Sequence, residues 1–155
     1  FLVTSERDGV KQIYRPAHPE VGRLYTELRS VARKQLAEVE RALNLYRDKR
    51  HEFEQVSMEE LQEKMDSGNA LLVDVRPRNE YENQHLPGAV SMPLDEIEDR
   101  LEDLPDDMEI VAYCRGPYCV FADDALKFLE SKGVKGSRLD FGVVEWELAG
   151  HSTES

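Results

Sequence analysis

The sequence predicts an α/β protein: a parallel sheet flanked by helices, preceded by an N-terminal β-hairpin and a long helix. Short apolar runs at 70–75, 88–93, 109–113 and 135–140 alternate with segments that have helical periodicity. Strands and helices in alternation form parallel sheets, because a crossover must return the chain to the same end of the sheet. The run 70–75 is almost continuously apolar, which is typical of a strand covered on both faces.

The first element that the sequence predicts is a hairpin over residues 1–18. Two β-rich segments, 1–7 and 10–15, flank Asp8-Gly9, a pair that favours a two-residue hairpin turn. Pro16 and Pro19 end this element. Because the chain starts with Phe1 rather than Met, we expect it to be a fragment that begins inside an element.

A single helix of about 30 residues is predicted over 19–50. After Pro19 this segment has no Pro and one Gly, and apolar residues recur every three to five positions: Val21, Leu24, Leu28, Val31, Leu36, Val39, Leu43 and Tyr46. A small domain alone is unlike to cover so long a stripe, so we expect a homodimer through helix 19–50. The alternative is a helix packed back on its own domain.

The third segment, 51–155, holds the remaining predicted elements. Ser57 and Glu60 form a capping box that opens a helix, and Gly68 closes it. The segments that follow are a strand at 70–75, a short strand at 88–93, an acidic helix at 94–104, a strand at 109–113, a helix from 120 to Gly133, a strand at 135–140 and a helix at 143–149.

Composition excludes several classes of protein. The apolar runs are only a few residues long, so we expect no membrane span, no signal peptide and a cytoplasmic location. The net charge of −12 is uneven: residues 1–50 hold 11 Lys and Arg against 7 Asp and Glu, and the rest is strongly acidic. An acidic part repels nucleic acid, while the basic part either contacts phosphates or is a solvated helix. Cys and His do not occur at zinc-ligand spacing, so we expect no metal and no cofactor.

The segment Cys114-Arg115-Gly116-Pro117-Tyr118-Cys119 is the candidate site. Cys114 ends the apolar run 109–113 and precedes the helical segment that starts at Val120. A sulfur among the free N–H groups of a helix N-terminus has a pKa below the usual value of about 8.5, so we expect Cys114 to be a thiolate. The alternative is a buried structural cysteine.

Several segments in order resemble a single rhodanese domain over about residues 56–150: Asp74-Val75-Arg76, Glu80-Tyr81, His85-Leu86-Pro87-Gly88-Ala89, the cysteine loop, and Leu139-Asp140-Phe141-Gly142 with Trp146. The resemblance implies that Cys114 is catalytic and accepts a sulfane sulfur from a donor as a persulfide, which a thiol acceptor or cyanide removes. Related phosphatases have a longer loop that ends in Arg; residue 120 is Val, which disfavours phosphatase activity.

The neighbours of Cys114 receive roles from the same resemblance. Arg115 faces an anionic donor, with a surface position as the alternative, Gly116 and Pro117 shape a nest of N–H groups, and Tyr118 forms the pocket wall. Cys119 is part of the substrate-binding loop and a candidate resolving thiol, with a small buried residue as the alternative. It replaces the Arg, Lys or Thr that many rhodaneses carry, so we expect thiosulfate to be a poor donor.

Asp74 and Arg76 are expected to form a structural ion pair near the loop rather than to act in catalysis. His85 in its turn and Trp146 are expected to be structural.

The first 50 residues resemble the end of an ArsR-type winged helix-turn-helix repressor. The match comprises a wing hairpin over 1–18 and a dimerisation helix over 19–50, joined by Tyr14-Arg15-Pro16. The resemblance implies that the full-length protein is a DNA-binding regulator, whose recognition helix lies upstream, fused to a sulfurtransferase domain at 51–155. The alternative is that Cys114 and Cys119 form a sulfur or redox sensor that controls DNA binding with little turnover. A rhodanese fold used only for interactions is a third possibility.

Overall fold

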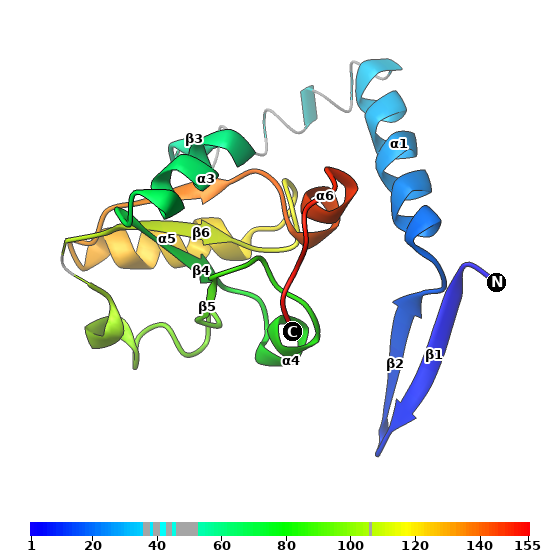
Figure 1. Ribbon diagram of the computed structural model, residues 1–155, viewed down its shortest axis with the longest axis horizontal. Helices are drawn as coiled ribbons and strands as arrows, with labels where there is room; N and C mark the ends of the chain where they lie inside the picture. Colours follow the sequence, from blue (N-terminus) through cyan, green and yellow to red (C-terminus); the bar gives the residue numbers. More distant parts are fainter. Residues whose placement is uncertain (36–37, 39–40, 43–44, 46–52, 106) are drawn as a thin grey trace. The chain divides into compact units, whose positions relative to one another are not determined.

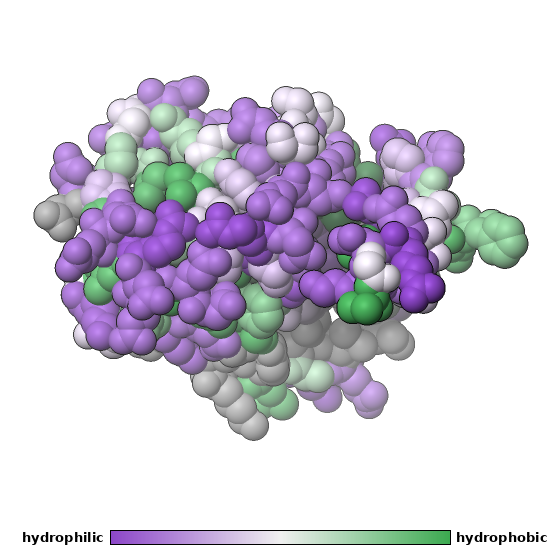
Figure 2. Space-filling model, turned by 90° about the horizontal axis from the view of Figure 1, so that it is seen from below, coloured by the Kyte–Doolittle hydropathy of each residue, from purple (hydrophilic) through white to green (hydrophobic). Residues whose placement is uncertain are grey.

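The computed structural model describes all residues except 36–37, 39–40, 43–44, 46–52 and 106 (Figure 1). The chain forms two compact units, Phe1–Arg47 and Asp48–Ser155. Among the described residues, no helix is both long and apolar enough to cross a bilayer. The face of the molecule in Figure 2 is mostly hydrophilic, as expected of a chain with 52 charged Lys, Arg, Asp and Glu side chains in total.

The first unit contains the predicted hairpin and helix. Strands β1 (Val3–Asp8) and β2 (Lys11–Pro16) pair antiparallel around the Asp8-Gly9 turn, and Gly9 has the positive φ of 58° that such a turn requires. Helix α1 follows over Pro19–Gln35. The described residues Glu38, Arg41, Ala42 and Leu45 are also helical. The other positions of the predicted helix up to residue 50 lie outside the described residues.

The second unit is built on a five-stranded sheet in which all neighbours pair parallel. The spatial order is β3 (Gln55–Val56), β7 (Gly136–Leu139), β6 (Glu109–Tyr113), β4 (Ala70–Asp74) and β5 (Val90–Ser91). Along the chain, α3 (Met58–Asp66) precedes β4, α4 (Arg78–Asn83) lies between β4 and β5, and η1 (Leu101–Asp103) precedes β6. Helices α5 (Phe121–Ser131) and α6 (Val143–Leu148) follow β6 and β7. The predicted fold class is confirmed.

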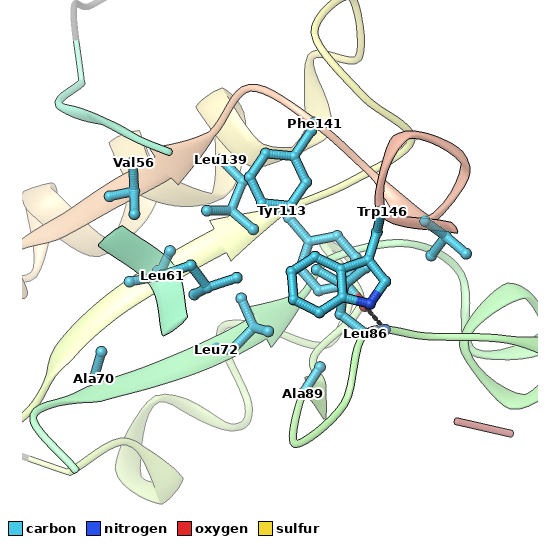
Figure 3. Packing of buried hydrophobic residues seen from close by; sticks show 12 residues of the cluster. Val56, Leu61, Ala70, Leu72, Leu86, Ala89, Tyr113, Leu139, Phe141 and Trp146 are labelled. Carbon is cyan, nitrogen blue, oxygen red and sulfur yellow. Dashed lines mark hydrogen bonds between the residues drawn. The ribbon is translucent and has the colours of Figure 1, made fainter. Parts of the chain in front are cut away.

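The alternation of side chains along the strands gives the sheet two buried faces. One face packs against α3 and α6: Leu72 of β4 and Tyr113 of β6 lie in one cluster with Leu61 and Trp146 (Figure 3). The other face packs against α5 and the segment before β6, in a second cluster with these members: Val73, Val75, Met92, Ile97, Leu104, Ile110, Ala112, Cys114, Ala122, Ala125, Leu126 and Leu129. Cys114 therefore lies on the face that α5 covers.

Most of the predicted elements of this unit are confirmed. The capping box is present, with the Ser57 hydroxyl accepting the Glu60 N–H and the Glu60 carboxylate accepting the Ser57 N–H. His85 is buried, stacks on Tyr81 and contacts the Tyr81 carbonyl through Nδ1 at 2.8 Å, which is a structural position. Trp146 is buried and donates its indole N–H to the Ser152 carbonyl.

The predicted acidic helix at 94–104 is wrong. Residues 94–100 form turns, and only Leu101–Asp103 is a short 3-10 helix. The segment has six Asp and Glu against one Arg, so carboxylates repel each other on a helix surface. Its single cation, Arg100, is instead bound to the Ser91 carbonyl and to Asp103. Burial of Ile97 and Leu104 holds the segment against the sheet without a regular helix.

Two short elements, β3 and α4, were not predicted. Strand β3 has two residues and is defined by its pairing with β7. Helix α4 has six residues and begins after Pro77 without a side-chain cap. Neither is long enough to show periodicity in the sequence.

Candidate active site in the cysteine loop

The cysteine loop connects the carboxyl end of β6 to the first turn of α5, as the sequence predicts. The loop folds back on itself through a hydrogen bond from the Cys119 N–H to the Gly116 carbonyl, at 3.1 Å. Gly116 has a φ of +126°, which residues with a side chain rarely adopt. Gly142, the residue before α6, packs directly beneath the loop: a Cβ there would lie 2.7 Å from the Cys114 carbonyl oxygen. A glycine at 142 is thus needed for the loop to lie where it does.

A buried arginine from β7 braces the loop. The Arg138 guanidinium donates to the Pro117 carbonyl at 3.0 Å and to the Cys119 carbonyl at 3.4 Å. Its charge is balanced by Asp123 in the first turn of α5, at 2.7 Å, and both side chains are almost fully buried. Arg138 therefore ties β7, the loop and α5 together at the edge where the parallel strands end.

The thiols of Cys114 and Cys119 interact by a hydrogen bond inside the loop. Cys114 is buried, at 2% exposure, and Cys119 is partly buried. The expected ring of N–H groups is present: the Ala122 N–H faces Cys114, and those of Arg115 and Phe121 face Cys119. The helix start and the loop backbone thus surround both sulfur atoms with donors, which favours a thiolate.

Within this pair the negative charge belongs to Cys119. The hydrogen bond from Cys114, the N–H groups of Arg115 and Phe121, and the charge of Arg115 lower the pKa of the Cys119 thiol to about 5, although burial opposes them. The hydrogen bond to Cys119 and burial raise the pKa of the Cys114 thiol. The prediction that Cys114 itself is the thiolate of the reduced loop is therefore wrong: Cys114 donates its S–H to the Cys119 sulfur.

Arg115 occupies a different environment from the one expected for a binding cation. Its guanidinium makes a two-pronged ion pair with Glu80 of α4, with Nε to Oε2 at 2.9 Å, and it lies 5.1 Å from the centre of the Phe121 ring. Arg115 remains exposed, Gly116 and Pro117 are buried, and Tyr118 is partly buried. The charge of Arg115 is thus largely balanced by a carboxylate before any donor arrives.

A cavity of about 340 Å³ lies in the part of the fold that holds the loop. Its lining residues are Val75, Pro77, Leu94, Asp95 and Phe121. Val75, Leu94 and Phe121 pack in the same hydrophobic cluster as Cys114 and Cys119. A larger cavity of about 960 Å³, lined in part by Phe53, Glu109 and Gly136, includes none of the loop residues in its lining. The smaller, mostly apolar cavity is the one suited to a substrate of the cysteine loop.

Asp74 and Arg76 form the buried ion pair that the sequence suggested. The Arg76 side chain donates to both Asp74 oxygens, with Nη2 to Oδ2 at 2.6 Å, and to the Gln84 carbonyl at 2.7 Å. Burial alone would lower the pKa of Arg76, but the hydrogen bonds and the charge of Asp74 raise it. Arg76 also lies 5.7 Å from the centre of the Tyr113 ring. The pair locks the end of β4 beside the end of β6, one residue before Cys114.

Sequence reasoning missed three residues that shape the site: Arg138, Asp123 and Glu80. A charged residue inside the predicted strand 135–140 was a usable signal for Arg138, because an unpaired charge in a buried strand is costly and needs a partner. Its partner, Asp123, is 15 positions away and no local pattern links the two. Among the described residues, no group of three or more His, Cys, Asp or Glu side chains is placed to hold a metal ion.

A parallel α/β domain that presents a cysteine at the end of a central strand, ringed by backbone N–H groups, defines a class of thiol-dependent domains. Within that class the chain belongs to the Rhodanese-like domain family, whose model matches residues 57–149.

Relatives and solved structures agree with this assignment. The chain is 42% identical over 149 residues to the HTH-type transcriptional regulator Rv0324 of Mycobacterium tuberculosis; the match covers 96% of the chain and 65% of that regulator. It is 30% identical to the putative sulfurtransferase YtwF of Bacillus subtilis, over 62% of the chain and 92% of that protein. The crystal structure of the BH2092 protein of Bacillus halodurans superposes with a TM-score of 0.62 and 27% identity, covering 75% of this chain and 85% of the other. The chain thus spans somewhat less than two thirds of the regulator's length.

Proposed function

We propose that residues 51–155 are a sulfurtransferase domain in which Cys114 takes up a sulfane sulfur as a persulfide and passes it to a thiol. The observation that carries this proposal is the position of Cys114 at the end of β6, with the Ala122 N–H facing its sulfur. Such N–H groups would stabilise the negative charge of a persulfide. Membership of the rhodanese family and the name of YtwF support the same chemistry.

The described site favours uncharged or organic sulfur donors over thiosulfate. A dianionic donor needs cations that are not already balanced, and Arg115 and Arg138 are paired with Glu80 and Asp123. The cavity beside the loop is mostly apolar, and its one ionisable lining residue, Asp95, would repel an anion. We therefore propose an organic persulfide or a polysulfide as the donor.

The test of persulfide formation is intact mass spectrometry of the reduced chain after incubation with cysteine persulfide, and separately with thiosulfate. We expect the organic donor to add sulfur to the loop or to oxidise it, and thiosulfate to react much more slowly. Cys114→Ser should show neither change, while Tyr118→Phe, which keeps both thiols, should react like the wild type. An unmodified wild-type chain with both donors would contradict the proposal.

We further propose that this domain is fused to a DNA-binding regulator of ArsR type, in which 1–18 is the wing and 19–50 the dimerisation helix. The match to Rv0324 includes nearly all of the chain, and so both units. Helix α1 leaves large apolar side chains exposed, namely Leu24, Tyr25, Leu28 and Val31, and Leu45 beyond it is exposed too. Leu24, Leu28 and Val31 are spaced four and three residues apart, and Leu45 is 14 beyond Val31, as a heptad pattern requires.

A dimer through this helix is testable by sedimentation equilibrium. We expect the wild-type chain to be a homodimer and Leu28→Glu to dissociate it, because a carboxylate would be buried without a partner in the interface. The matched control is Arg23→Glu, which introduces the same charge at another exposed position of α1. A monomeric wild type, or a dimer that tolerates Leu28→Glu, would contradict the proposed interface.

A second candidate function is a sulfur or redox sensor, in which the chemical state of the loop controls DNA binding of the full-length protein. The contact between the two thiols favours it, since one-step turnover needs only Cys114. Gel-shift assays of the full-length protein before and after treatment with cysteine persulfide distinguish the two. A change in DNA affinity that Cys114→Ser abolishes would support the sensor.

A further inference from the structure

Cys114 and Cys119 are held next to each other by the structure of the loop. The turn from Gly116 to Cys119 folds the chain back, and Arg138 holds the carbonyls of Pro117 and Cys119. Both cysteines contact the hydrophobic cluster beneath α5, and their thiols are hydrogen-bonded. A single sulfur-transfer cysteine needs no such neighbour, so the role of Cys119 needs its own account.

We propose that Cys119 resolves a persulfide on Cys114, so that the loop releases hydrosulfide and closes as a Cys114–Cys119 disulfide. This inference rests on the proposed function, because the persulfide must form on Cys114 first. It assigns to the domain a sulfide-releasing reaction in addition to transfer of sulfur to an external thiol.

The step balances as a thiol–disulfide exchange. The Cys119 thiolate attacks Sγ of Cys114, the bond from that Sγ to the outer sulfur breaks, and the outer sulfur leaves with its electron pair as HS⁻. The sulfane sulfur is reduced to sulfide, and the two cysteines are oxidised to the disulfide. An external thiol must reduce this disulfide before the next cycle: two thiol molecules restore the two cysteines and become a disulfide themselves.

The environment of Cys119 suits it to the attack. With a pKa lowered to about 5, first by the hydrogen bond from Cys114, it is a thiolate at neutral pH in the reduced loop. That hydrogen bond disappears once Cys114 carries the extra sulfur, but the N–H groups of Arg115 and Phe121 and the charge of Arg115 remain to stabilise the thiolate. The inner sulfur of the persulfide is the one that lies beside Cys119, since the contact is with the Cys114 sulfur itself.

The geometry also decides between the two sulfur atoms that Cys119 could attack. Attack on the outer sulfur would move the persulfide to Cys119 and leave the mass of the chain unchanged, whereas attack on the inner sulfur removes sulfur and two hydrogens relative to the persulfide and reduced forms. Mass and sulfide measurements therefore separate the alternatives directly.

The experiment uses the reduced, full 155-residue chain under anaerobic conditions with a limiting amount of cysteine persulfide. We expect the wild type to lose two hydrogens and to release about one hydrosulfide per chain, with cysteine as the other product. Cys119→Ser should instead gain one sulfur, retain it, and release only the hydrosulfide found in a blank without protein. Cys119→Ala serves as a second variant in case the serine hydroxyl perturbs the loop, and circular dichroism checks that both fold.

The possible outcomes are distinct. A wild type that keeps the extra sulfur on Cys114 as stably as Cys119→Ser overturns the inference and leaves the proposed function intact. Extra sulfur mapped to Cys119 by peptide analysis also overturns it, because Cys119 is then an acceptor of sulfur and not a resolving thiol. If folded Cys119→Ser and Cys119→Ala take up no sulfur at all, the proposed function fails and the inference fails with it.

Discussion

Replacing Arg138 by methionine is expected to lower the free energy of unfolding by about 3–5 kcal/mol, the usual cost of removing one partner from a buried ion pair. Asp123 would be left almost fully buried without the cation that balances it, and the carbonyls of Pro117 and Cys119 would lose a donor. Urea-induced unfolding followed by circular dichroism measures the change. Arg78→Met, which breaks an exposed ion pair with Glu96, is the matched control and should change stability little.

The double variant Asp123→Leu with Arg138→Met separates the stability of the domain from the position of the loop. Removing both charges together is expected to recover most of the lost stability, because no uncompensated charge stays buried. Sulfur uptake should remain impaired, since the brace on the loop carbonyls is still missing. Full recovery of both properties would show that Arg138 serves only to balance Asp123, and an unchanged stability of the single variant would contradict the buried pair altogether.

Asp74→Ala is expected to cost a similar 3–5 kcal/mol of stability at the opposite side of the loop. Asp74 is fully buried and accepts three side-chain hydrogen bonds and the backbone N–H of Arg76. Without it, the Arg76 guanidinium would remain buried with the Gln84 carbonyl as the acceptor described here. Thermal and urea unfolding measure the loss.

Two variants make the Asp74 prediction specific. Asp74→Asn keeps one oxygen acceptor but removes the charge, so we expect a smaller loss than for alanine. Glu80→Ala removes the half-exposed carboxylate that pairs with Arg115, and its effect on stability should be much smaller than that of Asp74→Ala. Equal losses in Asp74→Ala and Glu80→Ala would mean that burial of the Asp74–Arg76 pair does not determine its contribution.

The elements of the fold that the sequence revealed are those with a long repeated pattern or a strong local signal. The run 70–75 is apolar because β4 is covered on both sides, and Ser57 with Glu60 marks the start of α3 without any distant contact. The segment 94–104 has helical spacing of its apolar residues and still forms turns. There, charge repulsion and the contacts of Arg100 outweigh a pattern that only describes which side chains are buried.

The candidate site divides in the same way. That Cys114 ends a strand and opens the way into a helix is visible in the sequence, because both neighbours have clear periodicity. The protonation of the two thiols was not predictable: the local pattern gave donors near a sulfur, and only the contact with Cys119 shows which sulfur carries the charge.

The sequence by itself determined the α/β class, the order of most strands and helices, and the place of the cysteine loop at the end of a strand. Each depends on periodicity or on residues within a few positions of one another. Only the tertiary structure decided that Arg138 and Asp123 brace the loop and that Glu80 balances Arg115. These partners meet because β6 pairs with both β7 and β4, which places segments distant in sequence at one sheet edge, and strand order is a long-range property that no local pattern encodes.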